Sequence, residues 1–164
     1  MIMFRKFFIL LFPILFLHFP LHALTMDSNK GQIITSYMSG ENRILKAKKL
    51  EIKGKTKKAK KLYKEAFRFL LKANKEKPTD PNTLNYLGYT NRKLGNYEDA
   101  EIYYLLGLDL EPNHRGLNEY LGELYVITGR MYKAEEKLEF LKNCKCEEYK
   151  QLKEIIEDTK KTKY

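Results

Sequence analysis

Residues 81–114 read PNTLNYLGYTNRKLGNYEDAEIYYLLGLDLEPNH, and residues 115–148 read RGLNEYLGELYVITGRMYKAEEKLEFLKNCKCEE. When the second stretch is laid over the first, at a shift of 34 residues, the positions that agree include Leu87 with Leu121, Gly88 with Gly122, Gly95 with Gly129, and Ala100 with Ala134. Recurrence at a fixed interval indicates a structural unit that is repeated and stacked.

Small residues recur where helices would pack most closely. Gly88 and Gly122 have no side chain, so paired helices can approach each other there, and the recurring alanines allow the same approach on the partner helices. Gly95 and Gly129 stand between predicted helices, where glycine adopts positive φ at little cost. The pattern predicts antiparallel helical hairpins, which must stack because one hairpin cannot bury its own apolar face.

The sequence resembles the tetratricopeptide repeat (TPR) family, whose pattern is a large residue, Leu-Gly and Tyr, then Ala, an aromatic residue and Pro. Residues 81–114 carry it as Leu84, Leu87-Gly88, Asn91, Ala100, Tyr104 and Pro112, and the next unit as Asn118, Leu121-Gly122, Tyr125, Ala134 and Leu138. The resemblance implies an all-α, TPR-type solenoid of helical hairpins. A narrower resemblance, over about residues 81–157, is to small exported bacterial TPR proteins, through Arg92-Lys93-Leu94-Gly95, Glu119 to Tyr125, and Cys146-Glu147-Glu148-Tyr149.

The predicted organisation has a short leader, a linker and one helical domain. The ranges are a signal peptide at 1–23, a flexible linker at 24–40, and a helical domain at 41–164 with units at about 41–80, 81–114 and 115–146 and a capping helix at 147–160. The linker is predicted because residues 27–40 are polar and lack helical periodicity. The capping helix is predicted because Tyr149, Leu152, Ile155 and Ile156 share one face, which would cover the open end of the stack.

The first unit is degenerate and allows two alignments. A shift of 34 places Gly88 on Gly54, whereas a shift of 41 matches Gly95 to Ala100 with Gly54 to Ala59. We favour the shift of 41, which implies an extended helix running to about Asn74.

The N-terminus has the parts of a secretory signal peptide. Arg5 and Lys6 precede an apolar run from Phe7 to Phe19, and Ala23 is a small residue at a suitable cleavage position. We therefore expect an exported, periplasmic protein. The alternative is an uncleaved membrane anchor, which prolines and histidines within the run argue against.

The charge balance is basic. The chain of 164 residues has a formal net charge of +10, which favours acidic partners or weak association with an anionic envelope surface. The excess is mostly Lys, and Arg is the usual reader of phosphates and base edges, so we expect no nucleic-acid partner.

The sequence offers little for catalysis, and we predict that the protein is not an enzyme. His18 and His22 lie in the removable segment, and His114 stands alone at a helix start. No Ser-His-Asp or Cys-His set and no Gly-rich phosphate loop can be assembled. We expect no cofactor.

Cys144 and Cys146 are the only cysteines. In an oxidising compartment two cysteines tend to pair, so we predict a local disulfide between the third unit and the capping helix. A reactive redox pair stays open as an alternative. A metal site is not expected, because two thiolates supply only half of a zinc shell.

The TPR resemblance implies that the first helix of each unit lines a concave groove. The predicted partner-binding residues are Asn82, Asn85, Tyr89, Arg92 and Lys93 in the second unit, and Glu119, Glu123 and Val126, followed by Ile127, in the third. The residues of the second unit are amide, aromatic and basic, and those of the third unit are acidic and apolar. A wall of this composition suits an extended or helical peptide with both charged and apolar groups.

The leading hypothesis is an exported, non-catalytic adaptor or assembly factor that binds a peptide or protein in this groove. Two alternatives belong to other classes. One is a thiol–disulfide or metal-handling protein that uses Cys144 and Cys146. The other is a structural protein held at the envelope by its Lys excess.

Overall fold

A computed structural model describes residues 28–162, with side chains from Thr35 onward. Within these residues all regular structure is helical, as predicted. The helices are α1 (Ser28–Ile52), α2 (Thr56–Glu76), α3 (Pro81–Leu94), α4 (Tyr97–Leu110), α5 (Arg115–Ile127), α6 (Met131–Leu141), the 3-10 turn η1 (Lys142–Cys144) and α7 (Glu147–Thr162). The predicted signal peptide lies outside the described residues.

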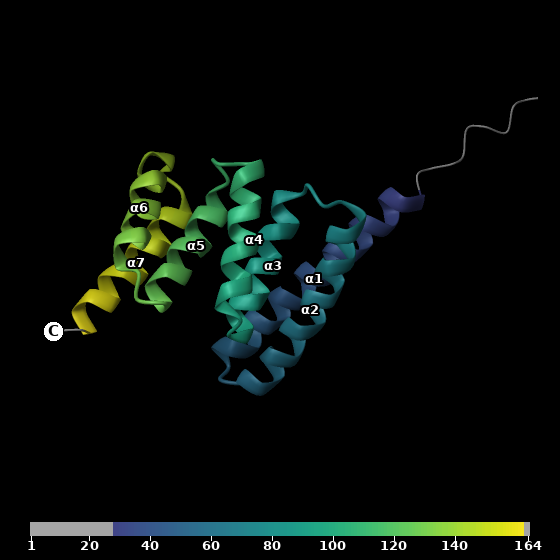
Figure 1. Cartoon of the computed structure of the whole chain (residues 1–164). Coiled ribbons are helices and arrows are strands. Elements are labelled where there is room, and N and C mark those ends of the chain that lie inside the picture. Colours follow the sequence, from purple (N-terminus) through teal and green to yellow (C-terminus); the bar gives the residue numbers. More distant parts are fainter. Residues whose placement is uncertain (1–27, 163–164) are drawn as a thin grey trace, which may run out of the picture.

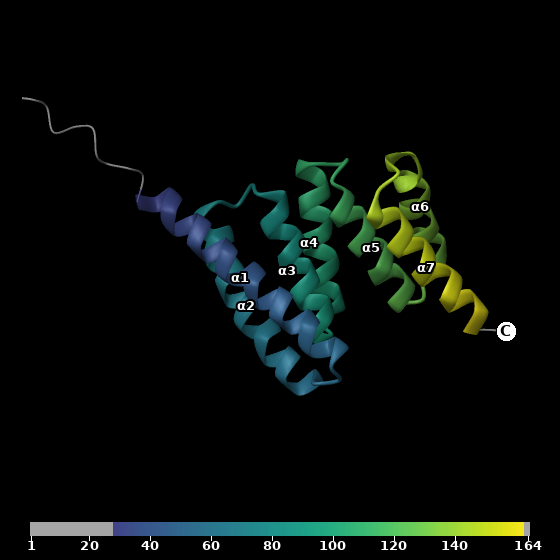
Figure 2. The same cartoon turned by 180° about the vertical axis from the view of Figure 1, so that it is seen from behind.

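The helices form three hairpins and a final single helix. Figures 1 and 2 show the hairpins side by side, from the α1–α2 pair at one end to α7 at the other. The odd-numbered helices also contact each other along the stack, α1 with α3, α3 with α5 and α5 with α7. We call the side lined by these helices the inner face, and the side lined by α2, α4 and α6 the outer face.

The three hairpin turns share one backbone geometry. Gly54, Gly95 and Gly129 have φ of 69°, 92° and 76°, a region that glycine enters without steric cost. Five residues beyond each glycine stands a fully buried alanine: Ala59, Ala100 and Ala134. Gly54 therefore corresponds to Gly95, which confirms the shift of 41. The extra seven residues lie in the second helix, because α2 has 21 residues where α4 has 14.

The flexible linker is wrong for residues 28–40, because α1 begins at Ser28. Gly40 is a packing position and not a linker glycine. A Cβ built there would lie 2.7 Å from the Cγ of Leu70 in α2, so the missing side chain lets the two helices meet. Tyr37, within the same stretch, packs against Tyr86 of α3 with ring centroids 5.8 Å apart.

The repeated glycines occupy corresponding places in α3 and α5 but make different contacts. Gly88 leaves room for the ring of Tyr104, in its own hairpin partner α4. A Cβ at Gly122 would instead lie 2.5 Å from the Cδ2 of Leu152 in α7. The expectation of equivalent contacts within each hairpin is therefore wrong. α7 follows the third hairpin directly, and its Leu152 side chain packs against α5 where Gly122 has no side chain.

The apolar interior lies between the packed helices. Leu84, Leu87 and Tyr104 are buried, while Leu94 and Leu108 are partly buried against the core. α7 covers the end of the stack as predicted, with Leu152 and Ile156 buried against α5 and α6. Among the described helices, none has the length and apolar character needed to cross a membrane.

Candidate inner-face interaction site

A chain of tyrosines crosses the inner face from the first hairpin to the third. The rings of Tyr63 and Tyr89 meet edge to face with centroids 6.0 Å apart, and Tyr89 meets Tyr120 at 5.0 Å. Tyr120 in turn approaches Tyr104 at 6.5 Å. Contacts of this kind each add about 1 kcal/mol beyond the area they bury. With Lys48 and Arg92, these four rings form what we call the inner layer.

Arg92 is the central cation of the inner layer. Its guanidinium carbon lies 5.3 Å from the ring centroid of Tyr89 and 5.5 Å from that of Tyr120. Nη1 donates a short hydrogen bond to Oε2 of Glu123 in α5, and the two side chains are only 7% and 14% exposed. Burial alone would lower the pKa of Arg92, but Tyr104 and Glu123 outweigh it, so the pKa is raised. The pair ties α3 to α5.

Lys48 of α1 is the second cation of the inner layer. Its Nζ donates to the hydroxyl of Tyr120 at 3.3 Å and lies 4.6 Å from the ring centroid of Tyr89. Burial lowers the pKa of Lys48, and the carboxylates of Glu119 and Glu123 partly restore it. Lys48 thus links the first hairpin to both of the following ones.

Glu119 is a buried carboxyl beside these cations. Its residue is 3% exposed, and Oε1 has no hydrogen-bond partner among the described residues. Burial raises the pKa of Glu119 to about 8, with further increases from Glu123 and Glu148, while Lys48 and Arg92 act in the opposite direction. The surroundings of Glu119 therefore favour its protonated form.

Lys93 and Glu51 lie nearer to solvent on the same face. Lys93 Nζ is 2.9 Å from Oε2 of Glu51, with the side chains 27% and 31% exposed. The same carboxylate accepts a hydrogen bond of 2.9 Å from the hydroxyl of Tyr63. With Glu123 and Ile127, which is 49% exposed, Lys93 and Glu51 form what we call the inner rim.

Most of the predicted partner-binding wall is closed by the stack itself. The buried members are Asn85, Tyr89, Arg92, Glu119 and Val126. Lys93 and Glu123 are half-buried, and Asn82 is exposed. The expectation of an open wall is therefore wrong for the five buried residues, because odd-numbered helices of neighbouring units pack against each other there.

Three residues of the inner layer and inner rim were not predicted: Lys48, Glu51 and Tyr120. The first two carried a signal, because the shift of 41 places Lys48 on Tyr89 and Glu51 on Arg92. Tyr120 also carried one, because the shift of 34 places Tyr86 on Tyr120.

His114 caps α5. Its Nδ1 accepts a hydrogen bond of 3.1 Å from the backbone N–H of Leu117, and Nε2 lies 3.2 Å from Oδ1 of Asn82. An accepting Nδ1 requires a neutral ring with the proton on Nε2, which then donates to Asn82. Asp80, 34 residues earlier, caps α3 through the N–H of Thr83 at 3.1 Å. His114 and Asn82 therefore serve the helix start.

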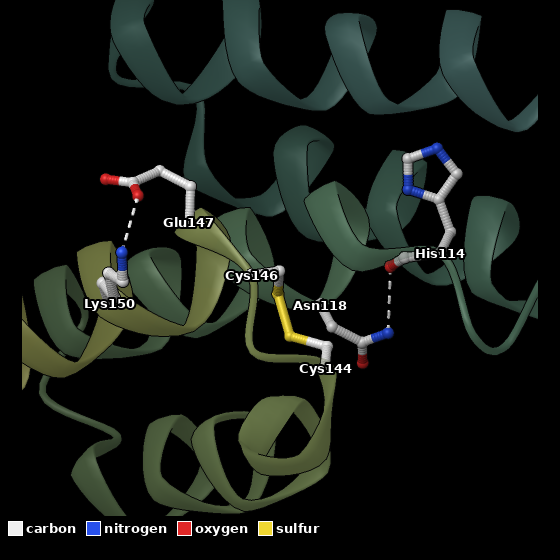
Figure 3. Close-up of a disulfide and its surroundings, with 6 residues drawn as sticks. All are labelled: His114, Asn118, Cys144, Cys146, Glu147 and Lys150. Atoms are coloured by element: carbon white, nitrogen blue, oxygen red, sulfur yellow. Dashed lines mark hydrogen bonds and ion pairs between the residues drawn. A yellow bond between two sulfur atoms is a disulfide. The ribbon is translucent and has the colours of Figure 1, made fainter.

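Cys144 and Cys146 form a disulfide between η1 and the start of α7, with their Cα atoms 5.1 Å apart. Figure 3 shows it beside Asn118, whose side chain donates to the backbone oxygen of His114 at 3.0 Å. Lys145, within the loop, has φ of 49°. Among the described residues no group of three or more His, Cys, Asp or Glu side chains is placed to hold a metal ion.

Comparison with known proteins agrees with this geometry. The tetratricopeptide repeat family model matches residues 81–114. No curated protein matches the sequence. A tetratricopeptide repeat protein from Parabacteroides merdae has a TM-score of 0.52 at 19% identity, covering 76% of this chain and 61% of that one. This chain thus spans less than two thirds of that relative.

Two further structures hold peptides. The Yersinia enterocolitica type III secretion chaperone SycD, in complex with a peptide of the translocator YopD, has a TM-score of 0.53 at 18% identity, covering 76% of this chain and 94% of that one. The second TPR of Spaghetti (RPAP3), bound to the HSP90 peptide SRMEEVD, has a TM-score of 0.50 at 12% identity, covering 71% and 96%. The chain therefore has the tetratricopeptide repeat fold and carries, at residues 81–114, a repeat of that family.

Proposed function

We propose that this protein is an exported, non-catalytic interaction module that binds a segment of another protein along its inner face. The observation that carries the proposal is the inner layer, which locks α1, α3 and α5 together beneath a partly exposed rim. Peptides bound by SycD and by Spaghetti, which share the fold, support a peptide or protein as the partner.

The inner rim defines the chemistry of the ligand. Glu51, Lys93 and Glu123 offer two carboxylates and one ammonium, and Ile127 adds an apolar surface that is half exposed. A rim of mixed charge next to an apolar side chain suits a segment that carries both charged and apolar groups. The rigid layer beneath it keeps the ordering cost of binding low.

The absence of catalysis is proposed from how the ionisable groups are used. Arg92 is engaged by Glu123 and Lys93 by Glu51, so the charges of the inner face hold helices together.

Export is proposed from the N-terminal sequence and is supported by the disulfide, because disulfides persist in oxidising compartments. Cell fractionation followed by N-terminal sequencing tests export. A chain that is found in the cytoplasm and still starts at Met1 overturns it.

Inner-rim variants test the binding site. Lys93→Glu and Ile127→Arg change residues that are at least partly exposed, whereas reversal of buried Arg92 would place a second buried carboxylate against Glu123. Matched controls are Lys60→Glu, exposed on α2, and Ile52→Arg, which replaces a residue 87% exposed at the end of α1.

A photo-crosslinking side chain placed at position 127 identifies the partner, and its affinity is then measured with each purified variant. We expect the rim variants to weaken binding at least about tenfold, which is 1.4 kcal/mol, and the controls to leave it unchanged. Equal affinities for all four variants would remove the inner face as the site.

A further inference from the structure

The outer face of α4 is apolar although it points away from the core. Four residues there are about half exposed: Ile102 (55%), Leu105 (44%), Leu106 (48%) and Leu110 (47%). The opposite side of the same helix buries Ala100, Tyr104 and Gly107. A helix that is apolar on both sides is normally covered on both sides, so a second surface is expected to pack on α4.

Carboxylates accompany this apolar stripe. α4 carries Glu98, Asp99, Glu101 and Asp109 and no basic residue. Only Glu101 has an ion-pair partner among the described residues, Arg130 at 2.8 Å. Asp109 lies in the last turn, where the helix dipole disfavours an anion and no basic side chain compensates it. The stripe is therefore suited to a surface that carries positive charge.

The neighbouring outer helix has the opposite character. Eight basic residues of α2 are all exposed: Lys57, Lys58, Lys60, Lys61, Lys64, Arg68, Lys72 and Lys75. Within the described part of the chain, none of their side chains forms an ion pair. Figure 1 shows α2 and α4 on the same side of the molecule, so one outer face presents an uncompensated basic helix next to an uncompensated acidic and apolar one.

We infer that the outer face binds a second copy of this chain, with α2 of each protomer lying on α4 of the other. The two-fold axis of this dimer would lie in front of the outer face, parallel to the helices and centred between α2 and α4. Rotation about it places α2 of one protomer opposite α4 of the other, and the same contact occurs twice, so the assembly closes as a dimer. Pairing α4 directly with α4 would instead bring like charges together. This inference goes beyond the proposed function, because it concerns the opposite face and leaves the inner rim free.

The charges lie at matching heights along the two helices. Because the turns at Gly54 and Gly95 are equivalent, residues of α2 correspond to residues of α4 at a shift of 41. This shift pairs Lys57 with Glu98, Lys58 with Asp99, and Arg68 with Asp109. An axis parallel to the helices preserves these heights, so each of these three basic groups of one copy would meet its matching carboxylate on the other.

The apolar stripe is covered by the same arrangement. Lys and Arg side chains bury their aliphatic stems along apolar surface while their charged ends reach a polar partner. Opposite Ile102 and Leu105, the shift of 41 places Lys61 and Lys64. The stems of these lysines, with Leu71 of α2, which is 38% exposed, would cover the stripe.

Two charge-reversed variants test the dimer. Variant A carries Lys57→Glu, Lys58→Glu and Arg68→Glu. Variant B carries Glu98→Lys, Asp99→Lys and Asp109→Lys. Each alone would meet like charges at both symmetric contacts, whereas A mixed with B would meet opposite charges at both.

Molar mass by light scattering and sedimentation gives the readout, with circular dichroism to show that each variant is folded. We expect a dimer for the unaltered chain, a dimer Kd raised about 100-fold for A and for B alone, and a dimer restored in the equimolar mixture. High salt should weaken the unaltered dimer.

Three outcomes overturn the inference. The first is a monomer at the highest soluble concentration. The second is a dimer that neither variant weakens, which would place the interface elsewhere. The third is a mixture that stays monomeric although A and B are folded. Leu105→Ser provides a second measurement: it leaves every charge in place and should weaken the dimer by reducing the apolar contact.

Discussion

Replacing Glu119 by Gln should make the protein more stable in mildly alkaline solution and should remove a pH dependence. Glu119 is 3% exposed, and burial raises the pKa of its carboxyl from an ordinary value of 4.5 to about 8. Between these two values the folded protein keeps a proton that the unfolded chain releases. The free energy of unfolding therefore decreases as pH rises from about 4.5 to about 8, and it is lowest above pH 8.

The magnitude follows from the size of this window. One such group changes the free energy of unfolding by about 1.4 kcal/mol per pH unit. Lys48 and Arg92 stabilise the charged form and Glu123 lies in the same network, so a loss of a few kcal/mol across the window is the appropriate scale. Gln has nearly the same shape and does not ionise, so Glu119→Gln should show no such loss.

Urea denaturation followed by circular dichroism at several pH values from 5.5 to 9 measures the effect, at one fixed protein concentration because association would shift the midpoint. Glu154→Gln is the matched control, since Glu154 is exposed and lies on α7, away from α2 and α4. The difference between the unaltered chain and Glu119→Gln should grow steadily from acid to alkaline pH. Parallel curves for the two proteins would show that Glu119 is ionised in the fold and that the reasoning is wrong.

Four further substitutions test the packing, the capping and the disulfide. Gly88→Ala should destabilise the protein by about 1–3 kcal/mol in thermal or urea unfolding. It should cost more than Gly122→Ala, because the new methyl group meets the buried ring of Tyr104 at position 88 but the flexible end of the Leu152 side chain at position 122. Equal costs for the two substitutions would contradict this. Asp80→Ala should cost about 1 kcal/mol through the lost cap of α3, and an unchanged midpoint would show that the cap contributes nothing. Cys144→Ser should cost only about 1–2 kcal/mol, because the closed loop is very short, and mass spectrometry of the native protein before and after reduction checks that the bond is present.

The repeat pattern predicted the stack because its signals lie within single hairpins. The turn glycines and the alanines that follow them are fixed by local backbone geometry, so a shift of the sequence against itself finds them. Gly40 misled the prediction for the opposite reason. Its role depends on Leu70 in another helix, and a polar stretch that contains glycine looks the same whether it forms a linker or a close helix contact.

The candidate site was predicted only in part, because much of it is buried between neighbouring hairpins. Tyr89 and Arg92 were assigned to the correct face but are covered by neighbouring odd-numbered helices. Tyr120 links two of these helices through ring contacts that depend on the tilt of one hairpin against the next. Spacing along one helix identifies a face, but it does not show how much of that face the adjacent unit occupies.

Tyr104 connects the outer face of the stack to its inner face. Its backbone belongs to α4, an outer helix, yet its ring fills the notch at Gly88 and lies against Tyr120 of the inner layer. A displacement of α4 by a bound copy and a displacement of the inner layer by a bound peptide would both act on this one ring. Thermodynamic reciprocity then requires that any change in peptide affinity caused by dimerisation be matched by an equal change in dimer affinity caused by the peptide.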